Sequence, residues 1–283
     1  AFERAIGDLW GHAPLDGDGL APWLDRGRWP LTKPLAPRPG PPRDGPFHED
    51  APDAGMRVPV GPVAGGIQPA AGLRVRLDGA RVADVEIRLG ATHRGALAQM
   101  RGKSPRAAAR YAARLAGDST VAHALAFAQA AEAAAGAEVP PRAQGLRAML
   151  LEWERMAHHL DAFADITAAL GAPGPNRDAA LLREYLARAL EAAFGHRMAM
   201  DVVVPGGLSS DLPPEGARIL AQLAGAVADA LPRLSRALSY PPIAARLGGL
   251  GSIDRATADA YALGGPAGRA AGRALDARGL DPI

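Results

Sequence analysis

The chain has 283 residues, 48% of them hydrophobic and 22% charged, which is enough for one large domain with a sizeable core. Its 32 basic and 30 acidic residues leave a formal net charge of only +2, and this balance argues against a nucleic-acid partner. The sequence holds no cysteine, which excludes disulfides, thiolate metal sites and cysteine-held iron–sulfur clusters within these residues.

The N-terminal part of the sequence divides into two segments of different composition. Residues 1–33 carry three tryptophans, and a proline-rich stretch follows from Pro34 to about Pro52. Proline lacks an amide donor and interrupts helices and central strands, so residues 34–57 are predicted to be an extended linker. The first residues do not resemble a signal peptide, and no apolar run is long enough to span a membrane. The lack of an initiator methionine and of a final capping element suggests that both ends are internal to a longer chain.

Residues 72–90 carry a strong β-hairpin signal. Apolar and polar side chains alternate on both sides of the dipeptide Asp78-Gly79, which is a favoured hairpin turn. The apolar positions of the alternation are Leu73, Val75, Leu77, Val85, Ile87 and Leu89. We therefore expect two antiparallel strands joined at this turn.

After His93 the hydrophobic period becomes helical. Ser104-Pro105 joins an N-cap serine to a proline at the first helical position, which predicts a helix start. Asp118 or Ser119 is predicted to cap the next helix, and Gly136 to end it. Further helices are predicted over residues 141–171, 176–195, 214–239 (with a candidate kink at Pro232) and 253–263. Together these elements predict an α+β fold that is mostly α: a helical bundle with a small antiparallel β-hairpin or sheet unit on its N-terminal side.

The long helix over 141–171 carries two constellations of ionisable residues. Glu152, Arg155 and His159 share one face, either as a polar, proton-handling network or as an intrahelical ion pair with a histidine at the rim. Glu154 and His158 have the spacing of a metal-binding pair, but no matching ligands accompany them, so no metal site is predicted.

Three further residues are candidates for a site. His93 and Arg94 stand where the hairpin passes into the helices, and Arg94 either binds an anion or faces solvent in a turn. His123 lies among alanines, which predicts close packing and a buried, hydrogen-bonded histidine rather than a ligand. These predictions rest on local sequence alone.

An ordered set of motifs resembles one protein family. The stretches "VGPVAGGIQP", "LDGARVADVEIRLGATHRG", "AHALAFAQAAE", "VPPRAQGLRAMLLEWERMAHHL", "GHRM", "VVPGGL" and "GPAGRAAGRALDARG" are similar to the large subunit of membrane-bound [NiFe] hydrogenases and to the related 49-kDa quinone-site subunit of respiratory complex I. This resemblance covers residues 58–283. Residues 1–33 resemble the end of the 30-kDa complex I subunit, which precedes the large subunit in hydrogenases of the formate hydrogenlyase type.

The resemblance implies a pocket from which the reactive residues are missing. The hydrogenase turn that holds nickel and iron through a cysteine pair aligns with Ala116 and Ser119, and thiolates are the ligands that such a metal requires. The quinone-binding tyrosine of the complex I branch aligns with Gly117, and the pocket histidines align with Ala64 and Gly72. The second cysteine pair of the hydrogenases aligns beyond Ile283. The matching frame positions are His93, Arg94, His123, Glu132, Arg142, Glu152, Arg155, His159 and Arg269.

Three functions follow as expectations. The first is a nickel-free, oxidoreductase-type subunit, peripheral to the cytoplasmic face of the inner membrane, that docks an iron–sulfur small subunit and couples electron transfer to membrane-arm subunits. In it Arg94, Glu152, Arg155, His159 and Arg269 are expected to form a charged network at the former pocket. The second is a quinone-reducing subunit whose catalytic candidates are Asp118, His93 and His123. The third is a stand-alone interaction protein without a redox role.

Overall fold

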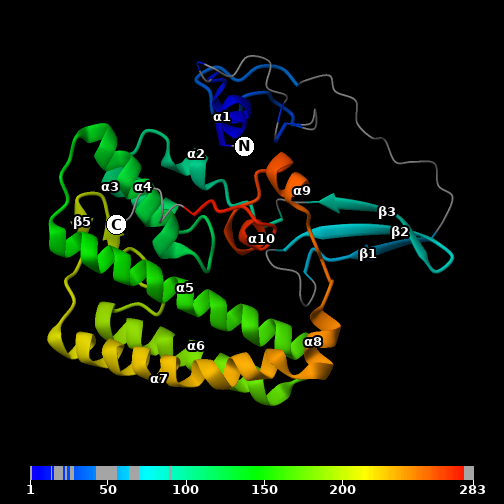
Figure 1. The fold of residues 1–283 in the computed structure, drawn as a ribbon. Coiled ribbons are helices and arrows are strands. Elements are labelled where there is room, and N and C mark those ends of the chain that lie inside the picture. The colour runs from blue at the N-terminus through cyan, green and yellow to red at the C-terminus, as the bar shows by residue number, and fades with distance from the viewer. Residues whose placement is uncertain are drawn as a thin grey trace. The chain divides into compact units, whose positions relative to one another are not determined.

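The computed structural model describes residues 2–13, 15, 22, 24–25, 29–42, 56–63, 70–88 and 91–276. The chain divides into two compact units, whose helices and strands are labelled in Figure 1. The first comprises residues 1–92 and 252–280, and the second comprises residues 93–251 with the last three residues. The division falls beside His93, where the hydrophobic period was predicted to change from that of a strand to that of a helix.

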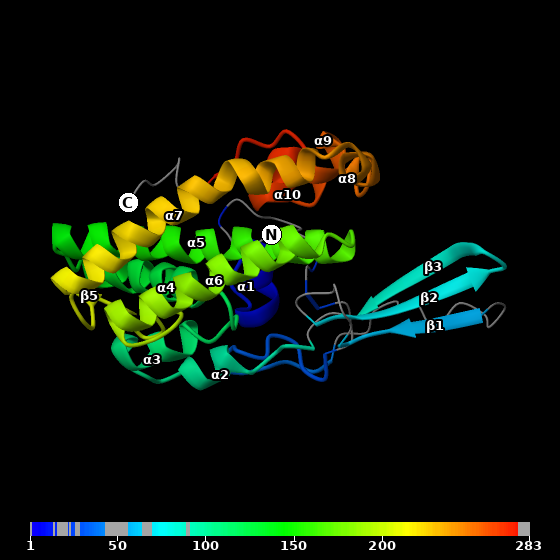
Figure 2. The same cartoon turned by 90° about the horizontal axis from the view of Figure 1, so that it is seen from below.

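The second unit is a helical bundle built on three long helices. Helices α5 (Pro141–Ala169), α6 (Pro173–Phe194) and α7 (Pro214–Ser239) follow one another in the chain, and α6 packs against both others (Figures 1 and 2). The remaining elements of this unit are α2 (Ala96–Met100), α3 (Pro105–Ala112), α4 (Thr120–Ala135), β4 (Val203–Val204), β5 (Gly207–Leu208) and α8 (Pro241–Leu247). Helix α4 packs against α3, α5 and the short hairpin β4–β5.

An apolar stripe along α5 forms the centre of this bundle. Leu150, Trp153 and Leu160 are buried, and Met149, Met156 and Phe163 pack against the same core. Residues three and four positions apart lie on one face of a helix, which explains why the stripe stays on the inside along the length of α5. Leu186 and Leu190 of α6, and Leu220 and Val227 of α7, complete the core from the neighbouring helices.

The helix ends follow several of the predicted capping signals. Ser104 caps α3 and accepts a hydrogen bond from the Ala107 amide at 3.4 Å, with Pro105 at the first helical position. Gly136 and Gly195 end α4 and α6 in the left-handed conformation, with φ values of 62° and 78° that glycine adopts without strain. Helix α7 continues through Pro232 to Ser239.

The first unit contains the predicted hairpin within a three-stranded antiparallel sheet. The sheet order is β1 (Met56–Val60), β2 (Gly72–Asp78) and β3 (Arg81–Arg88). The turn is formed by Gly79 and Ala80, one residue later than the predicted Asp78-Gly79, because Asp78 still pairs with Arg81. Val58, Val75 and Val85 are aligned across the three strands, so that one face of the sheet is apolar. The mostly-α, α+β prediction is thereby confirmed.

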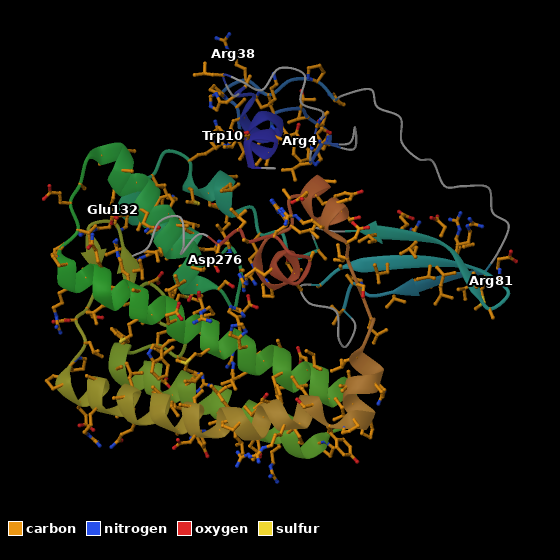
Figure 3. The ribbon with its side chains drawn as sticks, viewed as in Figure 1. Arg4, Trp10, Arg38, Arg81, Glu132 and Asp276 are labelled. Atoms are coloured by element: carbon orange, nitrogen blue, oxygen red, sulfur yellow. The ribbon has the colours of Figure 1, made fainter. Side chains whose placement is uncertain are left out.

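Helix α1 (Phe2–Trp10) belongs to the same unit and forms hydrogen bonds with the segment that follows it (Figure 3 labels Arg4 and Trp10). The buried Asp8 carboxylate accepts hydrogen bonds from the amides of Leu24 and Asp25, and the Leu35 amide donates to the Leu9 carbonyl at 2.9 Å. Leu35 is buried, so the chain is still packed on α1 just beyond the predicted linker start at Pro34. Most of the predicted linker, residues 43–55, lies outside the described residues.

Two short helices near the C-terminal end complete the first unit. These are α9 (Arg255–Ala260), which Asp254 caps through the Thr257 amide, and α10 (Gly265–Ala270). Among the helices that the structure describes, none combines the length and apolar character needed to cross a membrane.

Candidate functional site

The turn between α3 and α4, residues 113–119, is the candidate site, because the sequence resemblance predicts the reactive residues of the family at this turn. Two contacts attach this turn and the first residue of α4 to the loop that follows α6. Arg114 forms a bidentate ion pair with Asp201, with nitrogen–oxygen distances of 2.6 and 2.7 Å, and the hydroxyl of buried Thr120 donates to the Met198 carbonyl at 2.8 Å. The pairing holds the pKa of the Asp201 carboxyl below its ordinary value.

A glutamate from α5, rather than a residue of the turn, caps the start of α4. Ser119 occupies the N-cap position but makes no capping hydrogen bond, and Asp118 is exposed. Instead the Glu154 carboxylate accepts hydrogen bonds from the amides of Val121 and Ala122, at 2.7 and 2.8 Å. The prediction of a cap by the side chain of Asp118 or Ser119 was therefore wrong, because packing of α5 against α4 supplies the acceptor from another helix.

His158 joins the same cluster one helical turn after Glu154. Its Nε2 lies 3.1 Å from the Ser119 hydroxyl, so α5 contacts both the turn and the first amides of α4. A cavity of about 30 Å³ lies beneath this contact and is lined by Asp118, Glu154 and His158 together with residues of α6. Burial is the main cause that raises the pKa of the Glu154 carboxyl above its ordinary value, and the neighbouring Asp118 raises it further.

Arg94 approaches the outer side of the turn. Its Nη1 donates to the Arg114 carbonyl at 3.4 Å, and its Nη2 lies 3.7 Å from the point where a Cβ atom at Gly117 would stand. Any side chain at position 117 would therefore meet a guanidinium group. Arg94 itself is exposed, so both of its predicted roles, anion binding and a solvent-facing turn, remain compatible with this position.

The predicted triad on α5 does assemble. The Arg155 guanidinium donates to the Glu152 carboxylate, with its Nε at 2.9 Å, and its Nη1 lies 3.4 Å from His159 Nε2. The Arg155 and Glu152 side chains are 43% and 42% exposed, so this is a solvated network rather than a buried one. Its role as a charged network at a pocket stays a prediction.

The other predicted site residues are dispersed. His93 is exposed and its Nδ1 accepts a hydrogen bond from the Gly95 amide at 3.2 Å. His123 is half-buried rather than buried, and its side chain makes no hydrogen bond among the described residues. Arg269 belongs to the other unit, where it pairs with Asp276 at 3.1 Å. Of the predicted pocket-histidine positions, Gly72 begins β2, and Ala64 lies outside the described residues.

A buried ion pair near the other end of α4 was not predicted from the sequence. Glu132 and Arg147 are 7% and 2% exposed, and their closest nitrogen–oxygen distance is 2.6 Å (Figure 3 labels Glu132). Arg147 also donates to the carbonyls of Val204 and Gly207, and the Gly206 amide donates to Glu132. The pair therefore joins α4, α5 and the β4–β5 hairpin.

The sequence pattern indicates the burial of two charged residues of α5, Arg147 and Glu154. Arg147 stands three residues before Leu150 and Glu154 stands four after it, so both fall beside the apolar stripe. A charged residue at such a position is buried when the stripe is buried, and a buried charge requires partners. The identity of those partners cannot be derived from the sequence pattern.

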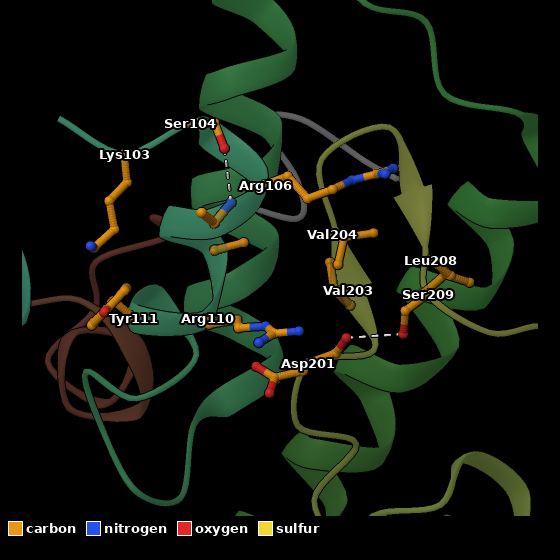
Figure 4. A pocket seen from close by; sticks show the side chains of 12 residues that line it. Lys103, Ser104, Arg106, Arg110, Tyr111, Asp201, Val203, Val204, Leu208 and Ser209 are labelled. Atoms are coloured by element: carbon orange, nitrogen blue, oxygen red, sulfur yellow. Dashed lines mark hydrogen bonds between the residues drawn. The ribbon is translucent and has the colours of Figure 1, made fainter. Parts of the chain in front are cut away.

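A second, larger cavity of about 810 Å³ is lined by residues of α3 and of the β4–β5 hairpin (Figure 4). Lys103, Arg106 and Arg110 contribute cationic groups to its wall, opposite β4 and β5. Asp201 also lines it, but its carboxylate is engaged by Arg114 and its carbonyl accepts a hydrogen bond from Ser209. The net positive lining is chemically suited to an anionic group.

The turn does not offer the ligands of a nickel–iron centre. Ala116 presents a methyl group, and the hydroxyl of Ser119 is already in contact with His158. No cluster of three or more metal-binding side chains occurs within the part of the chain that the structure describes. The donor set at this position therefore does not fit a thiolate-bound metal.

Comparison with known proteins finds that two parts of this chain match described protein families. Residues 94–170 match the family described as nickel-dependent hydrogenase, and residues 170–283 match the family of the respiratory-chain NADH dehydrogenase 49 Kd subunit. Two adjacent parts of the chain are thus similar to a hydrogenase family and to a complex I subunit family, and each match covers less than half of the chain.

Individual relatives come from both branches. The chain is 30% identical to the carbon monoxide-induced hydrogenase of Rhodospirillum rubrum, over 80% of this chain and 63% of that protein. It is 35% identical to a subunit of the NADH-quinone oxidoreductase of Salinispora tropica, over 74% of this chain and 54% of that protein. A chain of the membrane-bound sulfane sulfur reductase, an archaeal respiratory membrane complex, has a similar structure with a TM-score of 0.75 and 25% identity, over 81% of this chain and 62% of that chain. The chain thus spans only 54–63% of the length of these relatives.

Proposed function

We propose that this protein is a nickel-free subunit of a membrane-associated complex of the NADH:quinone oxidoreductase and energy-converting hydrogenase type. In this role it is peripheral to the cytoplasmic face of the membrane. It docks an iron–sulfur small subunit, which carries the clusters, and couples electron transfer to the membrane arm. The relatives support membership in such a complex, because their names place them in hydrogenases, quinone oxidoreductases and a respiratory membrane complex.

The residues of the turn at 113–119 support the nickel-free part of the proposal. Positions 116 and 119 hold an alanine and a serine, and the serine hydroxyl is in contact with His158. The frame around the turn is nonetheless built in detail, through the Arg114–Asp201 pair and the Glu154 cap. The contacts that hold the turn are present, but the thiolate ligands that hydrogen activation requires are not. This combination favours a role in assembly and charge coupling over hydrogen activation.

The test is purification of the tagged, native full-length protein from its own membranes, with protein identification and nickel determination. We expect an iron–sulfur subunit and antiporter-like membrane proteins to copurify, with far less than one nickel per chain. Nickel at full stoichiometry would overturn the nickel-free assignment. Isolation of the protein alone would overturn the complex and leave a stand-alone interaction protein.

The exposed carboxylate of Asp118 favours one second candidate, a quinone-reducing subunit with a remodelled pocket. A quinone headgroup needs a proton source at its carbonyl oxygens, and Asp118 stands next to Gly117, the position that Arg94 approaches. If Asp118 has this role, quinone reduction by the purified complex falls strongly in D118A and is unchanged in E138A, which removes an exposed carboxylate just beyond α4. Equal rates in both variants would exclude the role of Asp118.

A further inference from the structure

Glu154 is a buried carboxylate that no cation neutralises within the described part of the chain. It is 9% exposed, and its only hydrogen bonds among the described residues come from two backbone amides of α4. Taking an ionised carboxylate out of water is costly unless a charged partner compensates, and two amide dipoles compensate only in part. Burial without a neutralising cation among the described residues therefore favours uptake of a proton at this position, and the two amides oppose it in part.

The groups around Glu154 can exchange that proton. The 30 Å³ cavity beneath the turn exceeds the roughly 10–15 Å³ that one water molecule needs, and its wall includes Glu154, His158 and Asp118. His158 is half-buried and reaches the Ser119 hydroxyl, whereas Asp118 is exposed. Groups that bind protons thus extend from the buried carboxylate to the surface of the turn.

We propose that Glu154 is a proton-binding site that exchanges its proton with the outer side of the turn through a cavity water, His158 and Asp118. In the exchange the O–H bond of Glu154 breaks, the water relays the proton, and an N–H bond forms on the His158 imidazole. The result is a carboxylate and an imidazolium, and the net charge is conserved. No electron moves within this chain.

The remaining charges on the cavity wall are already paired. Asp161 of α5 binds Arg183 of α6 at 3.1 Å, and Arg197, which follows α6, binds Glu184 at 2.5 Å. Asp118 and His158 are therefore the groups that set the charge balance of Glu154. They act in opposite directions on its pKa, which Asp118 raises and His158 lowers, while burial raises it most.

This opposition defines an experiment on the full-length protein. The C=O stretching band of the protonated Glu154 carboxyl is followed by infrared spectroscopy as a function of pH, in H2O and D2O. We expect a band that persists above the ordinary titration range of glutamate, disappears in E154Q and is unchanged in E215Q, whose exposed carboxylate lies on α7.

The neighbouring substitutions decide whether the cluster acts as one unit. The midpoint of the band should move to lower pH in D118N and to higher pH in H158Q. Both variants retain Glu154 as the cap of α4, so they test the proposal even if E154Q does not fold. A purely structural cap predicts no such opposed shifts. Loss of the band at the ordinary pH of glutamate, or a midpoint that neither substitution moves, would overturn the proposal.

The inference on Glu154 does not require the proposed function, although its use in coupling electron transfer to proton movement does. The two are distinguishable. The infrared titration can fail while the protein still copurifies with membrane subunits, and the titration can succeed for a protein that purifies alone.

Discussion

The two buried glutamates of the bundle show how position shifts the pKa of one residue type in opposite directions. Glu132 and Glu154 are 7% and 9% exposed, and each accepts hydrogen bonds from backbone amides. Glu132 faces the guanidinium of Arg147, which lowers the pKa of its carboxyl. Glu154 faces no cation within hydrogen-bonding distance among the described residues, and burial raises the pKa of its carboxyl.

This difference assigns the two glutamates to different tasks. The Glu132–Arg147 pair fixes the β4–β5 hairpin to α4 and α5, because it binds the carbonyls of Val204 and Gly207 and the amide of Gly206. Glu154 caps α4 beside the candidate site, where its charge depends on its neighbours. Burial alone therefore does not indicate whether a carboxyl is structural or titratable.

The largest expected effect is the loss of the buried cation. R147M leaves the Glu132 carboxylate buried without its partner, which is expected to lower the free energy of unfolding by about 3–5 kcal/mol. Urea denaturation followed by circular dichroism measures this loss. The matched control is R142M, because the Arg142–Asp211 pair is exposed and should contribute little. An R147M protein as stable as R142M would contradict the structural role of the buried pair.

A smaller loss is expected when the cap of α4 is removed. E154A leaves the amides of Val121 and Ala122 without their acceptor, at a cost of about 1–3 kcal/mol in unfolding free energy. E152A, two residues earlier on the same helix, removes an exposed carboxylate and serves as control. Equal unfolding midpoints for the two variants would show that α4 does not depend on Glu154.

The pH dependence of stability should separate the two glutamates by sign. The stability that Glu132 contributes is present above the ordinary pKa of 4.5 and is lost as pH falls through its lowered folded pKa. The contribution of Glu154 has the opposite sign: it is present below 4.5 and is lost as pH rises through its raised folded pKa. In measurements of unfolding free energy against pH, E132Q should remove only the loss of stability at low pH. E154Q should remove only the loss of stability as pH rises above 4.5. A change in the same pH range for both variants would refute the assignment.

The smallest effect concerns a third glutamate, which lies at the surface. Glu184 binds Arg197 and Arg188, and these hydrogen bonds lower the pKa of its carboxyl to about 2. Because salt screens exposed charges, this pKa should move toward 4.5 at high ionic strength, as followed by carbon-detected NMR titration. The pKa of buried Glu154 should respond much less, and a larger salt response of Glu154 would contradict its burial.

The regular elements of this protein could be predicted from local sequence patterns. Apolar periodicity placed α5 and the hairpin β2–β3, and local chemistry placed the cap at Ser104 and the left-handed ends at Gly136 and Gly195. Each of these signals acts over a few neighbouring residues, through side-chain spacing or through the φ angles that glycine and proline favour. The family resemblance could be detected for the same reason, since it rests on ordered local motifs.

The side chains that meet at the turn, by contrast, are brought together by tertiary packing. The Arg114–Asp201 pair joins residues 87 positions apart, and Glu154 caps a helix that begins more than thirty residues before it. The sequence placed Glu154 beside a buried stripe but could not show that α4 would supply its amides, with no neutralising cation among the described residues. Contacts between distant segments depend on how the helices pack, and packing is a property of the whole fold that no local pattern encodes.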